Sequence, residues 1–201
     1  MTVLSDIYIL SRILVCIIVM RIASFDIGTR NTGLCVYNTD TKTVEHLELI
    51  DLLRPNDSDE YGWSDQAAVF LVKKMIQTRI SLFQRCDVIG IEKQMTRKMV
   101  VIQFALECLL EEMTSAKVYQ VVPRNVKNMF DTSTGKHRTN KVKAIEAVLA
   151  LTSLPPSIST YLNGSKKKDD LADAMLQAMY VAERVGVLHE KKQSYCVPRQ
   201  K

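Results

Sequence analysis

The first half of the chain alternates short apolar runs with polar turns, a pattern typical of a β-meander. Arg21–Asp26 is an apolar run that stops at Gly28, and Gly33–Tyr37 and Thr43–Ile50 follow as two more candidate strands. Residues 51–65 are polar and include a proline and a glycine, which predicts a loop. The opening of the domain is therefore expected to be three strands joined by short turns.

Beyond this loop the apolar positions change to helical spacing. Gln66–Phe83 and Lys98–Met113 carry apolar residues every three or four positions, which favours amphipathic helices. Asp87–Ile91 and Lys117–Val122 are apolar runs that predict two further strands, the first ending at Glu92. Strands and helices thus alternate through the middle of the chain.

The last third of the chain is predicted to be mainly helical. The expected segments are a short helix or turn at Arg124–Phe130, a polar loop at 131–138, a helix from Thr139 or Asn140 to about Leu151, a loop at 154–168 and a last helix at Asp169–Val185. Residues 187–201 are expected to form a loose tail.

This order of elements predicts an α/β fold. Three opening strands suit an antiparallel meander, and the later alternation of strands and helices suits parallel pairing, so the expected architecture is a mixed five-stranded sheet with helices on both faces. The expected domain spans residues 20–186, with residues 1–19 forming an extension of unassigned role. The apolar run Ile13–Met20 is too short to cross a bilayer, and no targeting segment and no membrane association are expected.

Composition narrows the class of protein only modestly. With 201 residues, 47% of them apolar and 24% charged, the chain is long enough for one domain with a core. A net charge of +5 permits a nucleic-acid partner without requiring one. The five cysteines are scattered and include no CxxC pair, which argues against a zinc site and a disulfide framework and for thiols in a reducing compartment.

Acidic residues at the ends of predicted elements carry the candidate chemistry. Asp26 and Glu92 each end an apolar strand, and Asp170 and Asp173 lie one turn apart at the start of the last helix. Each one alone is more often a turn residue, a helix cap or a solvated side chain. If the two strands are adjacent, however, four carboxylates converge, and such a cluster is costly unless it is protonated or binds cations.

The type of ligand indicates the metal. Carboxylates without cysteine or histidine favour Mg²⁺, with Mn²⁺ as a substitute. Two such ions about 3.5–4 Å apart activate a water and stabilise the leaving oxygen of a phosphodiester. The expected cofactor is therefore a pair of magnesium ions per active site, and the expected substrate is a nucleic acid rather than a small molecule.

The sequence resembles a known family at these positions. Three motifs resemble those of the RuvC-type Holliday junction resolvases: Asp26-Ile27-Gly28, the strand end at Ile91–Gln94 and the helix start at Asp170-x-x-Asp173. Within that family the sequence is most similar to the vaccinia-like poxvirus branch, and the resemblance covers roughly residues 20–185. The resemblance implies a ribonuclease H-like fold, a homodimer and magnesium-dependent paired nicks in four-way DNA junctions. It also implies that the four carboxylates are the catalytic metal ligands.

The same resemblance implies the biological setting. Poxvirus members resolve replicated genome concatemers into unit-length viral DNA, a process of DNA replication, recombination and repair in the host-cell cytoplasm, with the virion as a further location. Bacterial members carry an aromatic residue just after the glutamate for use at the junction centre, where Met95 stands in this chain. The family's dimer interface includes the helix expected at Lys98–Met113, whose apolar face includes Phe104; burial in the chain's own core is the simpler explanation of that face.

Basic residues cluster between the last strand and the last helix. Family members have a catalytic lysine in this segment; Lys141 matches it best and Lys127 second, and its role would be to stabilise charge on the phosphate. The other candidate DNA-binding residues are Arg97, Lys98, Lys127, Lys136, Arg138, Lys143, Lys166, Lys167 and Lys168. A solvated polar surface is the competing explanation for all of them.

Three alternatives to a resolvase remain open from sequence. An actin-like or sugar-kinase-like ATPase also opens with Asp-x-Gly-Thr, but it needs two lobes and a second phosphate loop. Another ribonuclease H-like nuclease, either a YqgF-like RNA-processing protein or a mitochondrial resolvase, would share the carboxylates. A DNA-binding scaffold without activity would not need Asp26 and its partners to be intact.

Overall fold

A single mixed sheet organises the part of the chain that the structure describes. The computed structural model describes residues 19–52, 64–133, 137–151 and 154–195. The strands are β1 (Arg21–Asp26), β2 (Thr32–Asn38), β3 (Thr43–Ile50), β4 (Val88–Glu92) and β5 (Lys117–Val121), in the order β3-β2-β1-β4-β5. The first three pair antiparallel, and β1, β4 and β5 pair parallel. The predicted mixed five-stranded sheet is confirmed.

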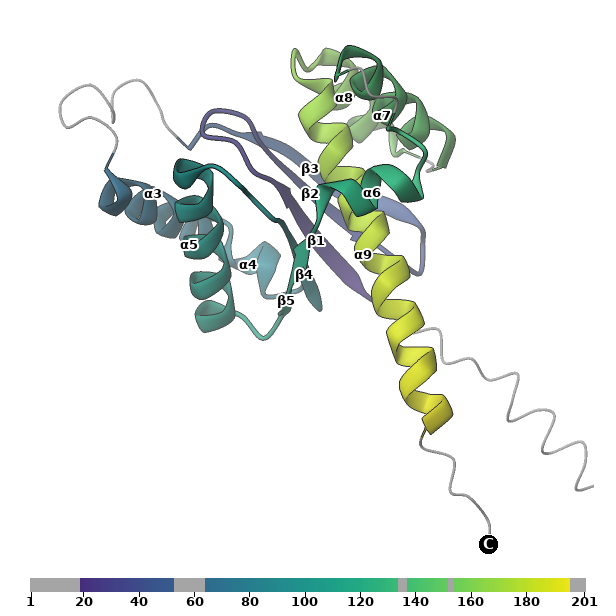
Figure 1. Ribbon diagram of the computed structural model, residues 1–201, viewed down its shortest axis with the longest axis horizontal. Coiled ribbons are helices and arrows are strands. Elements are labelled where there is room, and N and C mark those ends of the chain that lie inside the picture. The colour runs from purple at the N-terminus through teal and green to yellow at the C-terminus, as the bar shows by residue number, and fades with distance from the viewer. Residues whose placement is uncertain (1–18, 53–63, 134–136, 152–153, 196–201) are drawn as a thin grey trace, which may run out of the picture.

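Helices cover both faces of this sheet (Figure 1). On one face lie α3 (Asp65–Thr78), α4 (Ile80–Phe83) and α5 (Arg97–Met113). On the other lie α6 (Pro123–Met129), α7 (His137–Leu151), α8 (Pro156–Gly164) and α9 (Lys168–Tyr195). No helix in the described residues is both long and apolar enough to cross a membrane.

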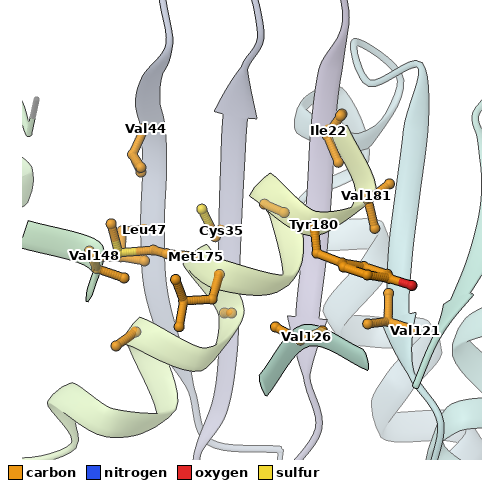
Figure 2. Packing of buried hydrophobic residues seen from close by; sticks show 14 of the residues in the cluster. Ile22, Cys35, Val44, Leu47, Val121, Val126, Val148, Met175, Tyr180 and Val181 are labelled. Atoms are coloured by element: carbon orange, nitrogen blue, oxygen red, sulfur yellow. The ribbon is translucent and has the colours of Figure 1, made fainter. Parts of the chain in front are cut away.

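Strand β1 lies at the centre and is buried on both sides. Ala23 and Phe25 pack with the α3–α5 layer, whereas Ile22 packs with the layer that contains α9. Because side chains alternate along a strand, a strand covered on both faces is apolar at nearly every position, as the sequence of β1 is. Figure 2 shows the second layer, where Met175, Tyr180 and other side chains of α9 pack against the strands.

Helix α9 packs closely against the sheet at Gly90. A Cβ added to Gly90 in β4 would lie 2.9 Å from a methyl carbon of Val181. The absence of a side chain at this position therefore lets the helix pack directly onto the strand. The fully buried α9 residues Ala174 and Ala178 add to the same fit.

Two expected helix boundaries differ in the structure. The helix expected over Gln66–Phe83 is divided at Arg79, whose guanidinium Nε donates to Glu48 of β3 at 2.8 Å. The first helix therefore ends just before Arg79, whose side chain binds β3, and the short helix α4 follows it. The helix expected to begin at Thr139 or Asn140 instead begins at His137, within the predicted polar loop.

Two further expectations about the C-terminal third are wrong. The loop predicted at 154–168 contains α8, because Pro156 occupies the first helical turn, where its missing N–H is not needed. Helix α9 continues to Tyr195 rather than ending at Val185. A single glycine such as Gly186 costs only about 1 kcal/mol relative to alanine inside a helix, so it does not end one.

Candidate active site

Two strand ends bring the first pair of acidic residues together. Asp26 is the last residue of β1 and Glu92 the last of β4. The strands are parallel neighbours with Phe25 paired to Ile91, so the next residue of each also lies beside the other. The carboxyl of Glu92 is close enough to Asp26 to raise the pKa of Asp26.

The start of α9 brings the second pair to the same place. Gly33 of β2 is the register partner of Asp26, and a Cβ added to Gly33 would lie 2.5 Å from the backbone oxygen of Asp170. The first turn of α9 therefore rests on β2 directly beside the end of β1. Asp173 follows one turn later on the same helix, and its charge acts on Asp26.

Burial and mutual repulsion shift the pKa values of these carboxyls. Burial raises the pKa of Asp26 well above its usual range, and the hydrogen bond and charge of Glu92 and the charges of Asp173 and Asp170 add to this. Burial likewise raises the pKa of Asp173 to about 6, with Lys127 opposing the shift and Glu92 adding to it. The cluster is thus a partly buried site where negative charges repel one another.

Lys141 lies at the edge of this cluster. Its ammonium group donates a hydrogen bond to the carboxylate of Asp169, which raises the pKa of Lys141. The charges of Asp170 and Asp173 act in the same direction. For Asp169, burial works to raise the pKa, but the contacts with Lys141 prevail and lower it. Lys141 is thus a cation in contact with the acidic end of α9.

The remaining basic candidates fall into separate groups. The charge of Lys127 reaches Asp173, and that of Lys167 reaches Asp169 and Asp170. Arg97 instead forms an ion pair with Asp65 at 3.3 Å, 88% of its side chain being exposed.

The other basic candidates lie at or near the surface. Lys143 donates to the backbone oxygen of Asp131 at 3.4 Å, Lys98 and Lys166 are exposed, and Lys168 is partly buried. Lys136 and the side chain of Arg138 lie outside the described residues.

The loop after Glu92 holds contacts that the sequence does not predict. The side-chain amide of Gln94 donates to Oε2 of Glu92 at 2.8 Å. Met95, next along, is 95% exposed. Asp169, which contacts Lys141, is likewise absent from the site residues expected from sequence. Pairings of this kind leave no pattern in the sequence.

The donor set suits a hard divalent cation, although the carboxylates are not drawn together around one point. The converging side chains supply carboxylate oxygens and no cysteine or histidine, which fits Mg²⁺ or Mn²⁺. Within the described ranges, no group of three or more His, Cys, Asp and Glu side chains is arranged so that it could hold a metal ion. Carboxylates that repel one another are expected to stay apart until a cation offsets their charge.

Comparison with known families shows which family this chain belongs to. A family model described as poxvirus A22 protein matches residues 20–184. The chain belongs to this family of Holliday junction resolvases. The expected relation to the poxvirus resolvase branch is therefore confirmed, and so is the expected class of activity, an endodeoxyribonuclease that hydrolyses phosphodiester bonds. No curated protein matches the chain.

Solved structures share the fold at low sequence identity. The fowlpox virus resolvase in complex with Holliday junction DNA is 19% identical, with 83% of this chain and 99% of that chain covered and a TM-score of 0.61. The Thermus thermophilus RuvC structure is 19% identical, covers 83% and 97%, and has a TM-score of 0.53. The yeast mitochondrial Holliday junction resolvase is 17% identical, covers 86% and 84%, and has a TM-score of 0.62. The predicted ribonuclease H-like fold is confirmed.

Proposed function

We propose that this Holliday junction resolvase makes paired nicks in four-way DNA junctions, in a reaction that depends on divalent cations. In this proposal Asp26, Glu92, Asp170 and Asp173 are the cation-binding carboxylates. The observation that supports it most is that these side chains, carried by β1, β4 and α9, act on one another electrostatically, and that burial and their mutual charge raise the pKa of Asp26 and Asp173. A buried group of this kind gains free energy when a cation replaces its protons.

The carboxylates favour Mg²⁺ as the cation, with two ions per site and Mn²⁺ as a substitute. Bound ions would lower the pKa of a water molecule and offset negative charge on the phosphodiester. The four side chains would then hold the ions in a fixed position at the ends of β1 and β4. The rigid sheet beneath them would keep that position the same from one turnover to the next.

Lys141 is proposed as the cation that stabilises the reacting phosphate. Its ammonium group already lies at the acidic end of α9, in contact with Asp169. A fixed positive charge beside the position of the phosphate would stabilise the charge that develops during cleavage. Lys127, whose charge acts on Asp173, is the second candidate.

Branched DNA is proposed to contact the basic residues around this end of the sheet. Lys143 lies on α7, Lys166 and Lys167 lie between α8 and α9, and Lys168 is the first residue of α9. Arg97 and Lys98 lie at the start of α5. Contacts of lysine and arginine with phosphates position a duplex without reading its sequence. This arrangement suits recognition of a junction by its shape.

A homodimer is proposed to form through α3 and α5. Phe70 on α3 and Phe104 on α5 are each 65% exposed, and the two helices lie side by side (Figure 1). Two large apolar side chains held in water are typical of an interface. A two-fold dimer would present two active sites to a two-fold junction.

The proposed biological role is resolution of replicated viral genome concatemers in the host-cell cytoplasm. Residues 20–186 are proposed as the working domain for this role. Residues 1–19 would precede it as an extension of unassigned role, and residues 187–201, of which 187–195 continue helix α9, would follow it.

Cleavage of a labelled junction tests the proposal. The full chain is incubated with a four-way DNA junction, a matched linear duplex and a matched RNA hairpin, with Mg²⁺, with Mn²⁺ or with EDTA. Symmetrical nicks in the junction alone, abolished by EDTA, are the expected result. Tight binding of the junction without cutting would favour a scaffold, and preferential cutting of the RNA would favour an RNA-processing nuclease.

A further inference from the structure

A chain of hydrogen bonds links the active-site glutamate to the interior of helix α5. Gln94 donates its side-chain amide to Glu92 at 2.8 Å. The backbone N–H of Gln94 in turn donates to Oε1 of Gln103 on α5 at 2.7 Å. Gln103 is one of the few buried polar side chains of the described residues, with 7% of its surface exposed.

The far end of this chain fixes the orientation of the Gln103 side-chain amide. Nε2 of Gln103 donates to Oε1 of Glu107 at 2.8 Å, and Gln120 on β5 donates to the same oxygen at 2.9 Å. An ionised carboxylate only accepts hydrogen bonds. Glu107 therefore requires the amide nitrogen of Gln103, which leaves Oε1 of Gln103 to accept from the backbone of Gln94.

We propose that Gln94 and Gln103 are positioning residues for Glu92, and that their hydrogen bonds hold the loop after Glu92 against helix α5. This inference rests on the proposed role of Glu92 as a cation ligand. Gln94 donates to one carboxylate oxygen of Glu92, which restricts the rotation of that carboxylate. Oε1 of Gln103 accepts a hydrogen bond from the backbone N–H of Gln94. Glu107 accepts from Nε2 of Gln103, which keeps Oε1 of Gln103 directed at that N–H.

Because Gln103 is buried, its hydrogen bonds favour one conformation of the loop after Glu92. A buried amide that lost its partners would leave unpaired polar atoms, which are costly, so the network favours one conformation of the loop after Glu92. Side chains that orient metal ligands typically change metal affinity or activity by about 10–100-fold when they are replaced. We call this chain of hydrogen bonds from Glu92 through Gln94 and Gln103 to Glu107 the relay. Its loss is expected to change metal affinity or activity by that amount, because its residues position Glu92 and do not contact the reacting atoms.

The test compares Gln103→Leu, Gln94→Leu and wild type in single-turnover cleavage of a four-way junction across a range of Mg²⁺ concentrations. We expect each variant to cut roughly 10–100-fold more slowly, with a higher half-saturating Mg²⁺ concentration. Junction affinity measured in EDTA is expected to stay within about two-fold, because neither residue is placed at the DNA surface. Equal rates and equal Mg²⁺ dependence in wild type and both variants would overturn the relay.

A matched control separates positioning from loss of stability. Leu110→Ala loosens the packing of the same helix at a fully buried position that lies outside the relay. At a temperature where all variants are folded, this control is expected to keep the Mg²⁺ dependence of wild type. A control that shifts the Mg²⁺ dependence as far as Gln103→Leu does would overturn the proposal.

An exchange of side chains gives a test by rescue. Gln103→Glu alone places two carboxylates against each other and is expected to cut more slowly. Adding Glu107→Gln restores a donor and an acceptor at each step, because the new carboxylate at position 103 accepts from the backbone of Gln94 and from the new amide at position 107. Recovery to within about three-fold of wild type is expected, and a folded double variant no faster than Gln103→Glu would count against the relay.

The proposed function and the relay fail in different ways. A wild-type chain that leaves the junction intact in Mg²⁺ and Mn²⁺ contradicts the proposed function. A wild-type chain that cuts, together with a folded Gln103→Leu variant that cuts equally well, contradicts the relay alone. If Gln103→Leu does not fold, Gln94→Leu decides the question, because Gln94 lies in the loop and is only partly buried.

Discussion

Asp26 and Glu92 end two neighbouring parallel strands, and the interaction of Glu92 with Asp26 helps to raise the pKa of Asp26. Burial and the interactions with Glu92 raise the pKa of Asp26, so in the metal-free protein Asp26 retains its proton more strongly than a free aspartate side chain does. Binding of a divalent cation at this pair is therefore expected to release a proton.

Replacement of Asp26 tests its role as a cation ligand. Asp26→Asn keeps the size of the side chain but removes its charge. Junction cleavage is expected to fall by on the order of 10³-fold, equivalent to about 4 kcal/mol of activation free energy, while junction affinity is retained. Single-turnover cleavage and a binding assay measure the two quantities, and a variant that cuts at the wild-type rate would remove Asp26 from the site.

Asp173 makes the stability of the metal-free protein depend on pH. Its pKa is raised from 3.8 to about 6 in the folded chain, so the stabilising effect of its proton is complete below about pH 4 and is lost as the pH rises through 6. The metal-free protein is expected to lose up to about 3 kcal/mol across this window. Thermal unfolding in EDTA between pH 4 and pH 8 measures the loss.

The variant Asp173→Asn supplies the control for this pH dependence. It is expected to flatten the fall in stability and to be more stable than wild type at pH 8 in EDTA. Mg²⁺ is expected to raise the melting temperature of wild type and to raise that of the variant less. A wild-type chain that grows steadily more stable from pH 4 to pH 8 in EDTA would contradict the raised pKa.

Lys141 is expected to affect the rate of cleavage more than binding. Lys141→Ala removes the cation that contacts Asp169, and cleavage is expected to slow by about 10²–10³-fold, the effect of losing one stabilising group for developing charge. Lys143→Ala, on the same helix, is expected to weaken binding and leave the rate at saturating enzyme unchanged. If Lys141→Ala cuts at the wild-type rate, Lys127→Ala becomes the decisive variant.

Gly33 determines how closely α9 approaches the sheet. In Gly33→Ala the new Cβ would lie 2.5 Å from the backbone oxygen of Asp170, so the start of α9 must move. We expect a loss of about 1–3 kcal/mol in the free energy of unfolding and slower cleavage. Gly164→Ala is the matched control, because nothing lies within 4 Å of the added carbon; an equal effect of both variants would contradict the close approach.

The exposed phenylalanine on α5 tests the dimer. Phe104→Glu places a charge on the apolar surface of α3 and α5 and is expected to shift the chain from dimer to monomer and to abolish paired nicking. Light scattering after gel filtration measures the mass. Leu149→Glu on α7, where Leu149 is 53% exposed, controls for any exposed apolar residue and is expected to leave the mass unchanged.

Much of the active site follows from local patterns in the sequence. Asp26 and Glu92 each follow an apolar run, and Asp170 and Asp173 are one turn apart, so their positions at element ends are predictable. The wrong expectations concern α8 and the end of α9, where a proline that begins a helix resembles one in a loop and a tolerated glycine resembles a stop. Both are local ambiguities, because the same residue type serves two roles.

The amino-acid sequence by itself determined the number, type and order of the strands and the positions of the four carboxylates along the chain, since alternation and helical spacing depend only on near neighbours. The tertiary structure decided which side chains meet: Lys141 with Asp169, Gln94 with Glu92, and Gly33 with the backbone of Asp170. These pairs are separated along the chain or depend on rotamers, and only the packing of α5 and α9 against the sheet selects them.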